Sequence, residues 1–562
     1  MKNENTAPVE AQQANQTVQE MLEAGQALVR QSAAHFADRC MQAGNVVTDL
    51  LDTYQSPLYE LAHLATQLMA AVQLQHHSLT LVDDERPGSR LVHQLAMLYA
   101  AETLHNLQFL FTRREASFGL EAEVIASLFG GDAISRFLTT WMAYSQVEEA
   151  ANLIEQVGNV GENNLTTEHL ALQIAFRQYA ADKVAPLAEE IHRQDLLIPE
   201  KMIADLAEMG CFGLSIPERY GGFAENDQPD HLAMVLVADE LSRASLGTAG
   251  SLGTRPELLA KALLKGGTVA QKQQWLPLIA RGEKQAAVAV TEPDYGSNVA
   301  GITTTARLVP SGWRLNGTKM WSTFAGRADI LMVLARTNPD RSQGHRGLSL
   351  FIVEKPPYTG HEFAYETDGG RLVGRAIAAI GYRGMHSFEL SFEDFFVPAE
   401  NLIGGDSGLG RGFYLQMHGF TASRLQTAGR ALGVMAAAFN AALHYSRERV
   451  VFDRRLMTYP LTRRKLVRMA MHTQAARRLT FHAARAVDAG GGSMAAAMAK
   501  LLTARTVEWI TREAQQLHGG MGYAEEFPIS RHFLDARVLS IFEGTEEVLA
   551  LRIIARTLLE ET

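Results

Sequence analysis

Cysteine is scarce in this chain, whose 562 residues include only Cys40 and Cys211. Two cysteines cannot build a disulfide framework, so the sequence argues against a disulfide-stabilised secreted protein and fits a reducing compartment. The chain also lacks an uninterrupted apolar run of roughly 18 residues, so no ordinary membrane span is predicted. Its first residues show no basic stretch followed by an apolar one, as a secretory signal would. We therefore expect a cytoplasmic protein without a membrane partner.

Positive charge is in deficit as well. The chain has 52 lysine and arginine residues against 62 aspartate and glutamate residues, for a formal net charge of −10. This balance argues against a nucleic-acid partner, because such binding depends on a positive field. Residues 447–468 are an exception because they form a basic run. The phosphates of a cofactor or of coenzyme A are a sufficient anionic target for that run.

The first 160 residues have a helical pattern. Thr17-Val18-Gln19-Glu20 fits a capping box, in which a hydroxyl and a carboxylate three residues apart satisfy free N–H groups at a helix start. Apolar residues then recur at helical spacing: Leu22, Val29, Ala33, Phe36 and Cys40. Glycine and asparagine residues at 158–164 predict a linker. Residues 1–160 are therefore expected to form a separate helical domain.

Three further domains are expected after the linker. Residues 165–285 are helical, residues 286–405 consist of short segments rich in β-branched and aromatic residues, and residues 406–562 are helical again. The middle domain predicts six to eight strands, and Asn316-Gly317 within it is typical of a β-hairpin turn. The order α, α, β, α predicts an α+β protein and argues against a doubly wound nucleotide-binding fold.

Two patterns that suggest ligand sites have simpler explanations. The sequence GLGRG at 408–412 looks like a phosphate loop, but no strand-then-helix unit surrounds it, so a loop between domains is expected. His76 and His77 have no partner at metal-ligand spacing, so a solvated helix face is expected there. We predict no metal site.

Two segments of the β domain carry residues suited to binding a planar ligand. In 289–301, Gly296 and Ser297 follow a proline turn and would present N–H groups and a hydroxyl. In 319–329, Trp321 stands beside two hydroxyl residues, which suits stacking on a ring and bonding to its polar edge. Taken alone, the first segment is equally an ordinary loop, and a core tryptophan is the commoner explanation of the second.

A third segment, 516–537, contains an unusual group of glycines. Gly519, Gly520 and Gly522 lie in a helical region, where each costs about 1 kcal/mol relative to alanine. Such a group indicates the close approach of a cofactor or of a neighbouring helix.

The fourth segment, 541–554, contains the predicted catalytic residue. Thr545 is a natural N-cap for the last helix, and Glu546 and Glu547 would interact with its dipole. Glu543 lies outside that helix and has no such structural explanation. Because two apolar residues precede it, we expect apolar surroundings that raise its pKa above ~4.3, which suits a base.

In this order and spacing, the four segments resemble the acyl-CoA dehydrogenase family from about residue 165 to the C-terminus. The resemblance implies an FAD-dependent enzyme with an N-terminal α domain, a middle β domain and a C-terminal domain like a four-helix bundle, here preceded by an extra helical domain. It implies that Glu543 removes the substrate's α-proton while hydride leaves the β-carbon, and that electrons pass to an electron-transfer flavoprotein. It also implies at least a homodimer, because two of the motifs contact the flavin of a neighbouring subunit.

The same resemblance assigns ligand contacts to individual residues. The flavin ring is expected to contact Val290, Thr291, Trp321, Ser322 and Thr323. The FAD of the neighbouring subunit is expected to contact Arg449, Phe452, Gln516, Gly519 and Gly520, and the adenosine end Thr545 and Glu547. The acyl-CoA thioester and its pantetheine arm are expected to face Ser297, Arg424 and Gly544, with Ser297 also near the cofactor. Two positions depart from the family pattern: Asn298, where aspartate is usual, and Pro460, near a usual flavin-contacting glutamine.

The chain length and the segments 251–267 and 366–390 are similar to those of family members that oxidise (2S)-methylsuccinyl-CoA to mesaconyl-CoA in the ethylmalonyl-CoA pathway. This substrate has a second carboxylate, which needs a cationic or hydrogen-bonding partner when it is buried. Arg255 is our candidate, and a surface arginine near a helix start is the alternative. The competing candidates are Arg371, Arg375 and Arg383.

Other functions stay open from the sequence. One is a dehydrogenase for another branched or long-chain acyl-CoA, whose pocket would lack a buried cation. Another is a flavin-bearing, DNA-associated protein like the alkylation-response branch of this superfamily, against which the negative charge and Glu543 count. Direct reduction of O₂, as in an oxidase, is a third.

Overall fold

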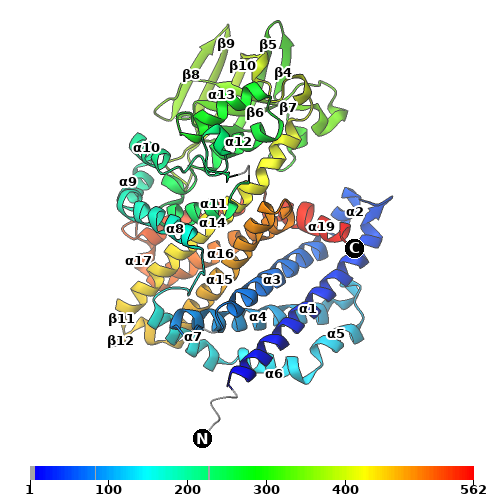
Figure 1. Ribbon diagram of the computed structural model, residues 1–562, viewed down its shortest axis with the longest axis vertical. Coiled ribbons are helices and arrows are strands. Elements are labelled where there is room, and N and C mark those ends of the chain that lie inside the picture. Colours follow the sequence, from blue (N-terminus) through cyan, green and yellow to red (C-terminus); the bar gives the residue numbers. More distant parts are fainter. Residues whose placement is uncertain (1–6, 83, 226–227) are drawn as a thin grey trace.

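The computed structural model describes residues 7–82, 84–225 and 228–562. The β domain lies at one end of the long axis, the N-terminal helices lie at the other, and the remaining helices lie between them (Figure 1). Within these described ranges, no helix is both long enough and apolar enough to cross a bilayer. The predicted order α, α, β, α is confirmed.

The N-terminal domain is helical, as predicted. Its helices are α1 (Ala7–Cys40), α2 (Thr48–Thr53), α3 (Gln55–Leu79), α4 (Pro87–Phe118), α5 (Ala122–Phe129), α6 (Asp132–Trp141) and α7 (Tyr144–Val157), and a short hairpin joins β1 (Met41–Gln42) to β2 (Asn45–Val46). The predicted apolar stripe from Leu22 to Cys40 is buried. The capping box at Thr17 is wrong, because α1 already begins at Ala7 and Thr17 lies in its interior.

The predicted linker is present, and it is held down by hydrogen bonds. Gln474 Nε2 donates to the Val160 carbonyl at 2.7 Å, and Arg478 Nη1 donates to the Asn163 carbonyl at 2.9 Å. His77 Nε2 lies 3.0 Å from the Glu162 carbonyl. The expected solvated face is wrong for His77, because its side chain is buried against this linker. Burial lowers the pKa of His77 to about 3, so the ring is neutral.

The second helical domain supplies one wall of the candidate site. Its helices are α8 (Thr167–Tyr179), α9 (Ala185–Gln194), α10 (Glu200–Glu208), α11 (His231–Ala244), α12 (Thr254–Gly266) and α13 (Val269–Ala280). The side chain of Asp230 accepts from the N–H of Ala233 and caps α11, and a capping box of Thr268 and Gln271 starts α13. α11 and α12 both pack against the long helix α14 (Gly412–Glu448).

The β domain has eight strands, as predicted. They are β3 (Ala286–Ala289), β4 (Thr305–Val309), β5 (Gly312–Thr323), β6 (Ile330–Arg336), β7 (Leu348–Glu354), β8 (Glu362–Thr367), β9 (Gly370–Ala376) and β10 (Ser387–Pro398). The sheet order is β3-β6-β4-β5-β10-β9-β8, and β7 pairs with β6. β6 is buried along its whole length, and its side chains enter two apolar clusters alternately.

The predicted hairpin turn at Asn316-Gly317 is wrong. β5 runs through both residues, and the chain turns instead at residues 310–311, between β4 and β5. Asn316 Nδ2 donates to Asp394 Oδ1 at 2.9 Å across a register shift between β5 and β10. Gly317, at φ +141°, lies opposite this irregularity, so the glycine accommodates a bulge.

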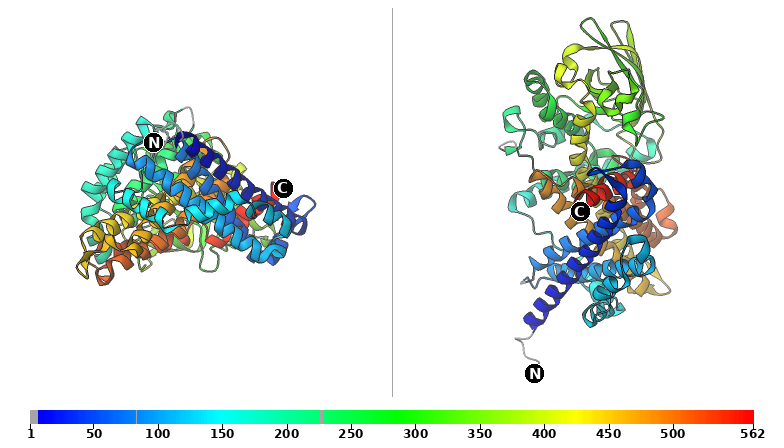
Figure 2. Two further views of the ribbon diagram at one scale, coloured as in Figure 1. Left: turned by 90° about the horizontal axis from the view of Figure 1, so that it is seen from below. Right: turned by 90° about the vertical axis from the view of Figure 1, so that its right-hand side faces the viewer.

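The C-terminal domain is helical. Besides α14 it contains α15 (Pro460–Asp488), α16 (Ser493–His518), α17 (Gly520–Tyr523), α18 (Pro528–Ala536) and α19 (Arg556–Glu560), and a hairpin of β11 (Val450–Val451) and β12 (Arg454–Arg455) follows α14. The N-terminal helices α3, α4 and α7 pack on α15, and α1 packs on α19 (Figures 1 and 2). The interhelical loop predicted at residues 490–492 is confirmed.

The basic run on α15 faces the N-terminal domain. Arg463 Nε contacts Glu148 Oε2 at 2.5 Å, and Arg468 Nη2 lies 3.2 Å from Glu102 Oε1. For these two residues the expected cofactor or coenzyme A phosphate is wrong, because carboxylates of the same chain are their counter-ions. Arg463 also donates to the Glu148 carbonyl and to Asn152, so it docks α7 on α15.

We predict that Arg463→Ala weakens this docking. Arg463 is buried, and its loss leaves a carboxylate, a carbonyl and an amide oxygen without their donor, at a cost of about 1–3 kcal/mol. Urea unfolding measures the change. The control is Arg464→Ala, because Arg464 is exposed on the same helix. Equal stabilities for the two variants would contradict a docking role for Arg463.

Candidate active site

Glu543 lies in a short loop between two helical segments, η10 (Arg537–Ser540) and η11 (Val548–Ala555). Its backbone is left-handed, at φ +58°, and that of Gly544 is at φ +101°. Lys500 Nζ on α16 donates to the Gly544 carbonyl at 2.5 Å, which anchors the loop. The predicted N-cap is confirmed, because Thr545 Oγ1 accepts from the N–H of Val548 at 3.4 Å. Glu543 is therefore held outside a helix, as predicted.

The carboxylate of Glu543 has four donor groups around it. Its Oε1 lies 3.0 Å from Arg255 Nη1 on α12 and 3.0 Å from Arg430 Nη2 on α14. Its Oε2 accepts from the hydroxyl of Ser423 and, at 2.7 Å, from that of Thr427. Only 6% of the side chain is exposed.

The predicted apolar surroundings and raised pKa of Glu543 are wrong. Burial by itself raises the pKa of this carboxyl, but the two guanidiniums and the two hydroxyls outweigh it and lower the pKa to about 2. The two residues before Glu543 do not make the site apolar, because Arg430 also stacks on the Phe542 ring at 4.9 Å. As it stands, Glu543 is an ionised and weak base.

Three of these partners were missed by the sequence reasoning. Ser423, Thr427 and Arg430 follow one another at spacings of four and three residues, so they share one face of α14. Arg430 is completely buried and bonds Ser251 through its Nη1 at 3.0 Å. The sequence signal was an arginine among alanine and glycine residues, at helical spacing from two hydroxyl residues.

Arg255, the candidate partner of a substrate carboxylate, lies beside the predicted base. It is buried and points at Glu543, so the alternative of a surface arginine is wrong. Its competitors lie elsewhere: Arg371 pairs with Glu366 and Arg375 with Glu362 on the β8–β9 surface, and Arg383 donates to the His192 carbonyl at 3.0 Å.

Arg424, a predicted thioester residue, completes a cationic wall on α14. Its Nε has no hydrogen-bond partner within the described part of the chain. Burial lowers the pKa of Arg424 to about 10, against the opposing effect of Glu543. The predicted substrate residues Gly544 and Arg424 thus lie with Glu543, whereas Ser297 is exposed on the β-domain loop.

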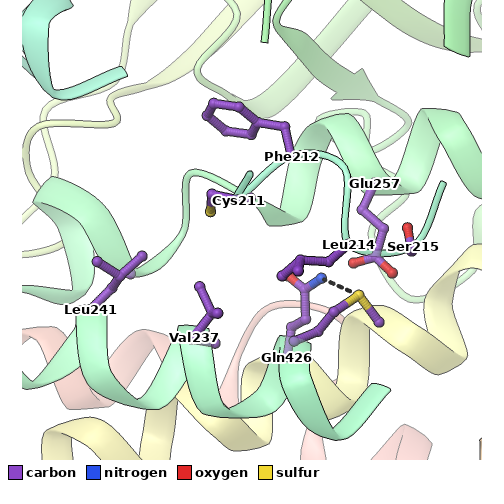
Figure 3. A pocket seen from close by; sticks show the side chains of 12 residues that line it. Cys211, Phe212, Leu214, Ser215, Val237, Leu241, Glu257 and Gln426 are labelled. Atoms are coloured by element: carbon purple, nitrogen blue, oxygen red, sulfur yellow. Dashed lines mark hydrogen bonds between the residues drawn. The ribbon is translucent and has the colours of Figure 1, made fainter. Parts of the chain in front are cut away.

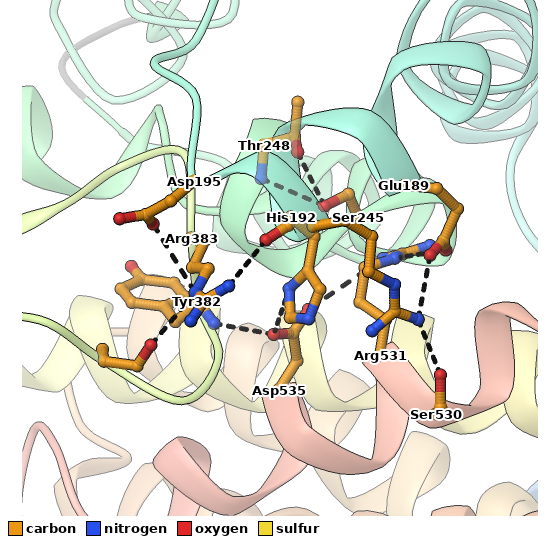
Figure 4. A network of polar contacts seen from close by, with 12 residues as sticks. Glu189, His192, Asp195, Ser245, Thr248, Tyr382, Arg383, Ser530, Arg531 and Asp535 are labelled. Carbon is orange, nitrogen blue, oxygen red and sulfur yellow. Dashed lines mark hydrogen bonds and ion pairs between the residues drawn. The ribbon is translucent and has the colours of Figure 1, made fainter. Parts of the chain in front are cut away.

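A polar network joins three domains behind this loop (Figure 4). The N–H of Tyr382, in the loop between β9 and β10, donates to Asp535 Oδ1 on α18 at 2.7 Å. Arg531 Nε bonds Glu189 Oε1 on α9 at 2.7 Å. The Tyr382 ring meets that of Phe542 edge-on at 5.7 Å, beside Glu543. The β domain therefore helps to position the loop that carries Glu543.

The predicted flavin residues form one group where β3 ends beside β5. Lys319 Nζ donates to the Val290 carbonyl at 3.0 Å and to Glu292 Oε1 at 2.9 Å, and the N–H of Met320 donates to the Thr291 carbonyl at 2.8 Å. Trp321 is 54% exposed, at φ +58°, so the alternative of a core tryptophan is wrong. These contacts keep both predicted segments side by side.

The side chains of this group fit a flavin. Trp321 presents an open indole, Thr323 bonds Ser387 at 2.9 Å, and the buried hydroxyl of Ser322 has no partner within the ranges that the structure describes. A buried hydroxyl normally has a partner, and a ligand with polar edge atoms would supply one.

The five residues predicted to contact the FAD of a neighbouring subunit lie at the other end of the helical bundle, whereas Thr545 and Glu547, predicted for the adenosine end, follow Glu543 in the chain. Arg449, Phe452, Gln516, Gly519 and Gly520 are all exposed, and Phe452 is 90% exposed. The two segments adjoin, because Tyr445 stacks on His518 with ring centroids 4.4 Å apart. A Cβ atom on Gly519 or Gly520 would meet nothing within 4 Å among the described residues, so no neighbouring helix in that part of the chain explains these two glycines. In Figure 1 the β11–β12 hairpin lies far from β5. One chain thus presents two separate groups of predicted cofactor residues.

A small cavity lies between α11, the start of α12 and α14 (Figure 3). Its volume is about 20 Å³, enough for one water molecule. Glu257 and Gln426 reach into it, and burial raises the pKa of the Glu257 carboxyl.

Comparison with protein-family models assigns three consecutive domains. Residues 166–283 match the acyl-CoA dehydrogenase N-terminal domain, residues 287–395 its middle domain and residues 410–559 its C-terminal domain.

Individual relatives agree with this result. The chain is 37% identical over 547 residues to (2S)-methylsuccinyl-CoA dehydrogenase of Cereibacter sphaeroides, covering 95% of this chain and 96% of that protein. It is 34% identical to the short-chain specific acyl-CoA dehydrogenase of Megasphaera elsdenii, covering 66% of this chain and 92% of that one. Among solved structures, glutaryl-coenzyme A dehydrogenase in complex with glutaryl-CoA has a TM-score of 0.64 at 29% identity and covers 70% of this chain and 95% of its own.

We predict that the buried pair Lys319–Glu292 stabilises the two β-domain segments that are predicted to contact the flavin. Lys319→Met leaves the Glu292 carboxylate buried without its counter-ion, at a cost of about 3–5 kcal/mol. The double change Lys319→Met, Glu292→Gln is expected to recover part of this loss. Urea unfolding measures it, and Lys201→Met, at an exposed position of α10, is the control. A double variant no more stable than Lys319→Met contradicts the pairing.

The same pair has an expected pH dependence. Burial opposes ionisation of Glu292, but Lys319 and the donors of Thr303 and Thr304 lower its pKa from 4.5 to about 2. A depressed folded-state pKa contributes stability above pH 4.5 that is lost as the pH falls towards 2. Glu292→Gln should therefore remove part of the loss of folding stability that the protein shows as the pH falls from 4.5 towards 2.

Proposed function

The chain belongs to the acyl-CoA dehydrogenase family, and we propose that it oxidises (2S)-methylsuccinyl-CoA, or a thioester of the same dicarboxylic class, to the α,β-unsaturated product. As a member it is an FAD-dependent oxidoreductase that acts on a CH–CH bond of an acyl-CoA. The identity of the acyl group is the proposal. It rests on one observation, namely that two buried arginines, Arg255 and Arg430, contact the one carboxylate of the predicted base.

That excess of cations favours a second anion in the site. Arg255, Arg430 and Lys500 are buried around the carboxylate of Glu543, and the half-buried Arg424 lies close by. Buried charges that lack counter-ions are costly, and a guanidinium binds a carboxylate through paired hydrogen bonds. A monoacid acyl-CoA carries no such group at the end of its acyl chain, whereas a dicarboxylic thioester does. The similarity to (2S)-methylsuccinyl-CoA dehydrogenase supports the same choice.

The reaction removes two hydrogens and forms a carbon–carbon double bond. Glu543 takes the α-proton on its carboxylate, and the β-hydrogen leaves as hydride. The backbone N–H of Glu543 is placed by the left-handed loop, and it would donate to the thioester oxygen as enolate charge develops there. Bound FAD supplies the hydride acceptor. Trp321, Ser322 and Thr323 would hold its ring.

Two partners are part of the proposal. The exposed group around Phe452 and Gly519 would complete the flavin site of a second subunit, so the enzyme would be at least a dimer. An electron-transfer flavoprotein would take up the electrons. A chain similar to this one belongs to a solved structure whose title names the electron transferring flavoprotein of Acidaminococcus fermentans. In an oxidase, O₂ would instead reoxidise the reduced flavin as fast as the substrate reduces it.

We expect Glu543→Gln to keep bound FAD and to lose flavin bleaching by substrate. A positioned general base contributes about 10²–10⁴-fold to the rate, and glutamine cannot take the proton. Anaerobic stopped-flow absorbance measures the bleaching, and the flavin content of the purified variant is the control. Bleaching at the full rate would rule out Glu543 as the base.

We also expect the parent enzyme to prefer a dicarboxylic substrate. Bleaching by (2S)-methylsuccinyl-CoA should exceed that by butyryl-, isobutyryl- and octanoyl-CoA, because only the first offers the arginines a carboxylate. A preference for a monoacid would keep the family assignment and refute the substrate. Salt-dependent DNA binding with no bleaching would favour the DNA-associated alternative.

A further inference from the structure

We propose that Arg255 and Arg430 hold Glu543 inactive in the substrate-free enzyme, and that the free carboxylate of the substrate releases it by taking its place on the arginines. This inference rests on the proposed function. It concerns the step between binding and proton removal. It makes the residues that recognise the substrate also the residues that control the base.

The first support is that the carboxylate has no free acceptor site. A carboxylate offers about four lone-pair positions, and Glu543 has four donors: two guanidiniums on Oε1 and two hydroxyls on Oε2. Thr427 also lies 2.9 Å from the Ser423 carbonyl, but its contact with Glu543 is shorter, at 2.7 Å, and charge-assisted. Glu543 must therefore give up at least one donor before it can accept a proton from carbon.

The second support is the distribution of charge. The groups that face the pair come from every element packed on it: Arg255 and Glu257 of α12, Arg424 and Arg430 of α14, Lys500 of α16 and Tyr382 of the β9–β10 loop. Cations dominate this set. An incoming substrate carboxylate therefore finds a counter-ion already present in the site. The exchange replaces one buried carboxylate–guanidinium contact by another of the same kind.

The third support is that Glu543 belongs to no regular element. It lies between η10 and η11 in a left-handed loop, and Lys500 anchors the next residue, Gly544, rather than Glu543 itself. A side-chain rotation of Glu543 thus breaks no helical hydrogen bond. Arg430 is held by Ser251 and by the Phe542 ring, so it stays in place to receive the substrate carboxylate.

The consequence is selectivity in the chemical step. A monoacid acyl-CoA that fits the pocket would leave Glu543 on its arginines, so it would bind and react slowly. A dicarboxylic substrate would free the base, whose pKa then rises towards that of an ordinary carboxyl. Discrimination would appear in kcat more than in KM.

The experiment supplies the missing carboxylate separately. FAD-loaded enzyme is mixed anaerobically with saturating butyryl-CoA and increasing formate, with chloride keeping the ionic strength constant. Formate is expected to accelerate bleaching saturably, by about tenfold or more, which is the factor for losing one charge-assisted hydrogen bond. Formate should not accelerate bleaching by (2S)-methylsuccinyl-CoA. No acceleration beyond the chloride control would overturn the inference.

A variant gives an independent measurement. Arg255→Gln removes one of the two guanidiniums, so bleaching by butyryl-CoA without formate should rise, while that by (2S)-methylsuccinyl-CoA falls. The acid limb of the pH–rate profile with butyryl-CoA should move to higher pH, which a merely structural role would not cause. The matched control is Arg464→Gln on the exposed face of α15. Equal losses with both substrates and an unmoved acid limb would overturn the inference.

The outcomes separate this inference from the proposed function. Fast bleaching by (2S)-methylsuccinyl-CoA with no formate effect would keep the substrate and reject the release mechanism. A formate effect together with no reaction of (2S)-methylsuccinyl-CoA would reject that substrate and keep the control of Glu543 by its arginines. No bleaching by any thioester would reject both. The formate titration uses the unmodified enzyme, so it stands even where Arg255→Gln fails to fold.

Discussion

The contact between one carboxylate and two buried arginines is the constraint on which the candidate site depends. Arg255 comes from α12, Arg430 from α14, and Glu543 from the loop before the last helical segment, so the contact joins three distant parts of the chain. Each partner would be costly to bury alone, and together with the hydroxyls of Ser423 and Thr427 they satisfy one another. The packing of α11, α12 and α14 therefore sets the electrostatics of the base directly.

The β domain contributes to the same site from the other side. Its loop between β9 and β10 brings Tyr382 against Phe542, and Asp535 and His192 hold that loop. A Cβ on Gly247 would lie 2.3 Å from the Arg383 carbonyl, so the close approach of this loop to the second domain requires a glycine there. The predicted flavin strand β5 belongs to the same domain, so one domain carries both the predicted flavin contacts and one side of the Glu543 loop.

The N-terminal domain covers a face of the C-terminal helices. Its carboxylates neutralise arginines of α15, and Tyr59 donates to Glu546 at 3.3 Å, three residues after the predicted base. The predicted dipole partner Glu546 thus has a second role, as a contact between domains. Arg552 and Asp52 add an ion pair of 2.8 Å on the same face. The N-terminal domain therefore holds the last helical segment, and with it the end of the loop that carries Glu543.

The sequence by itself determined the domain order, the eight-stranded middle domain within the predicted six to eight, the position of Glu543 outside a helix and the loops at 158–164 and 490–492. These features depend on local pattern, namely on apolar spacing, glycine, proline and capping residues. Only the tertiary structure decided the state of Glu543, the burial of His77 and the counter-ions of the basic run. Each of those depends on residues more than 80 positions away, as with Arg255 and Glu543 or His77 and Glu162, and a local pattern carries no information about such contacts.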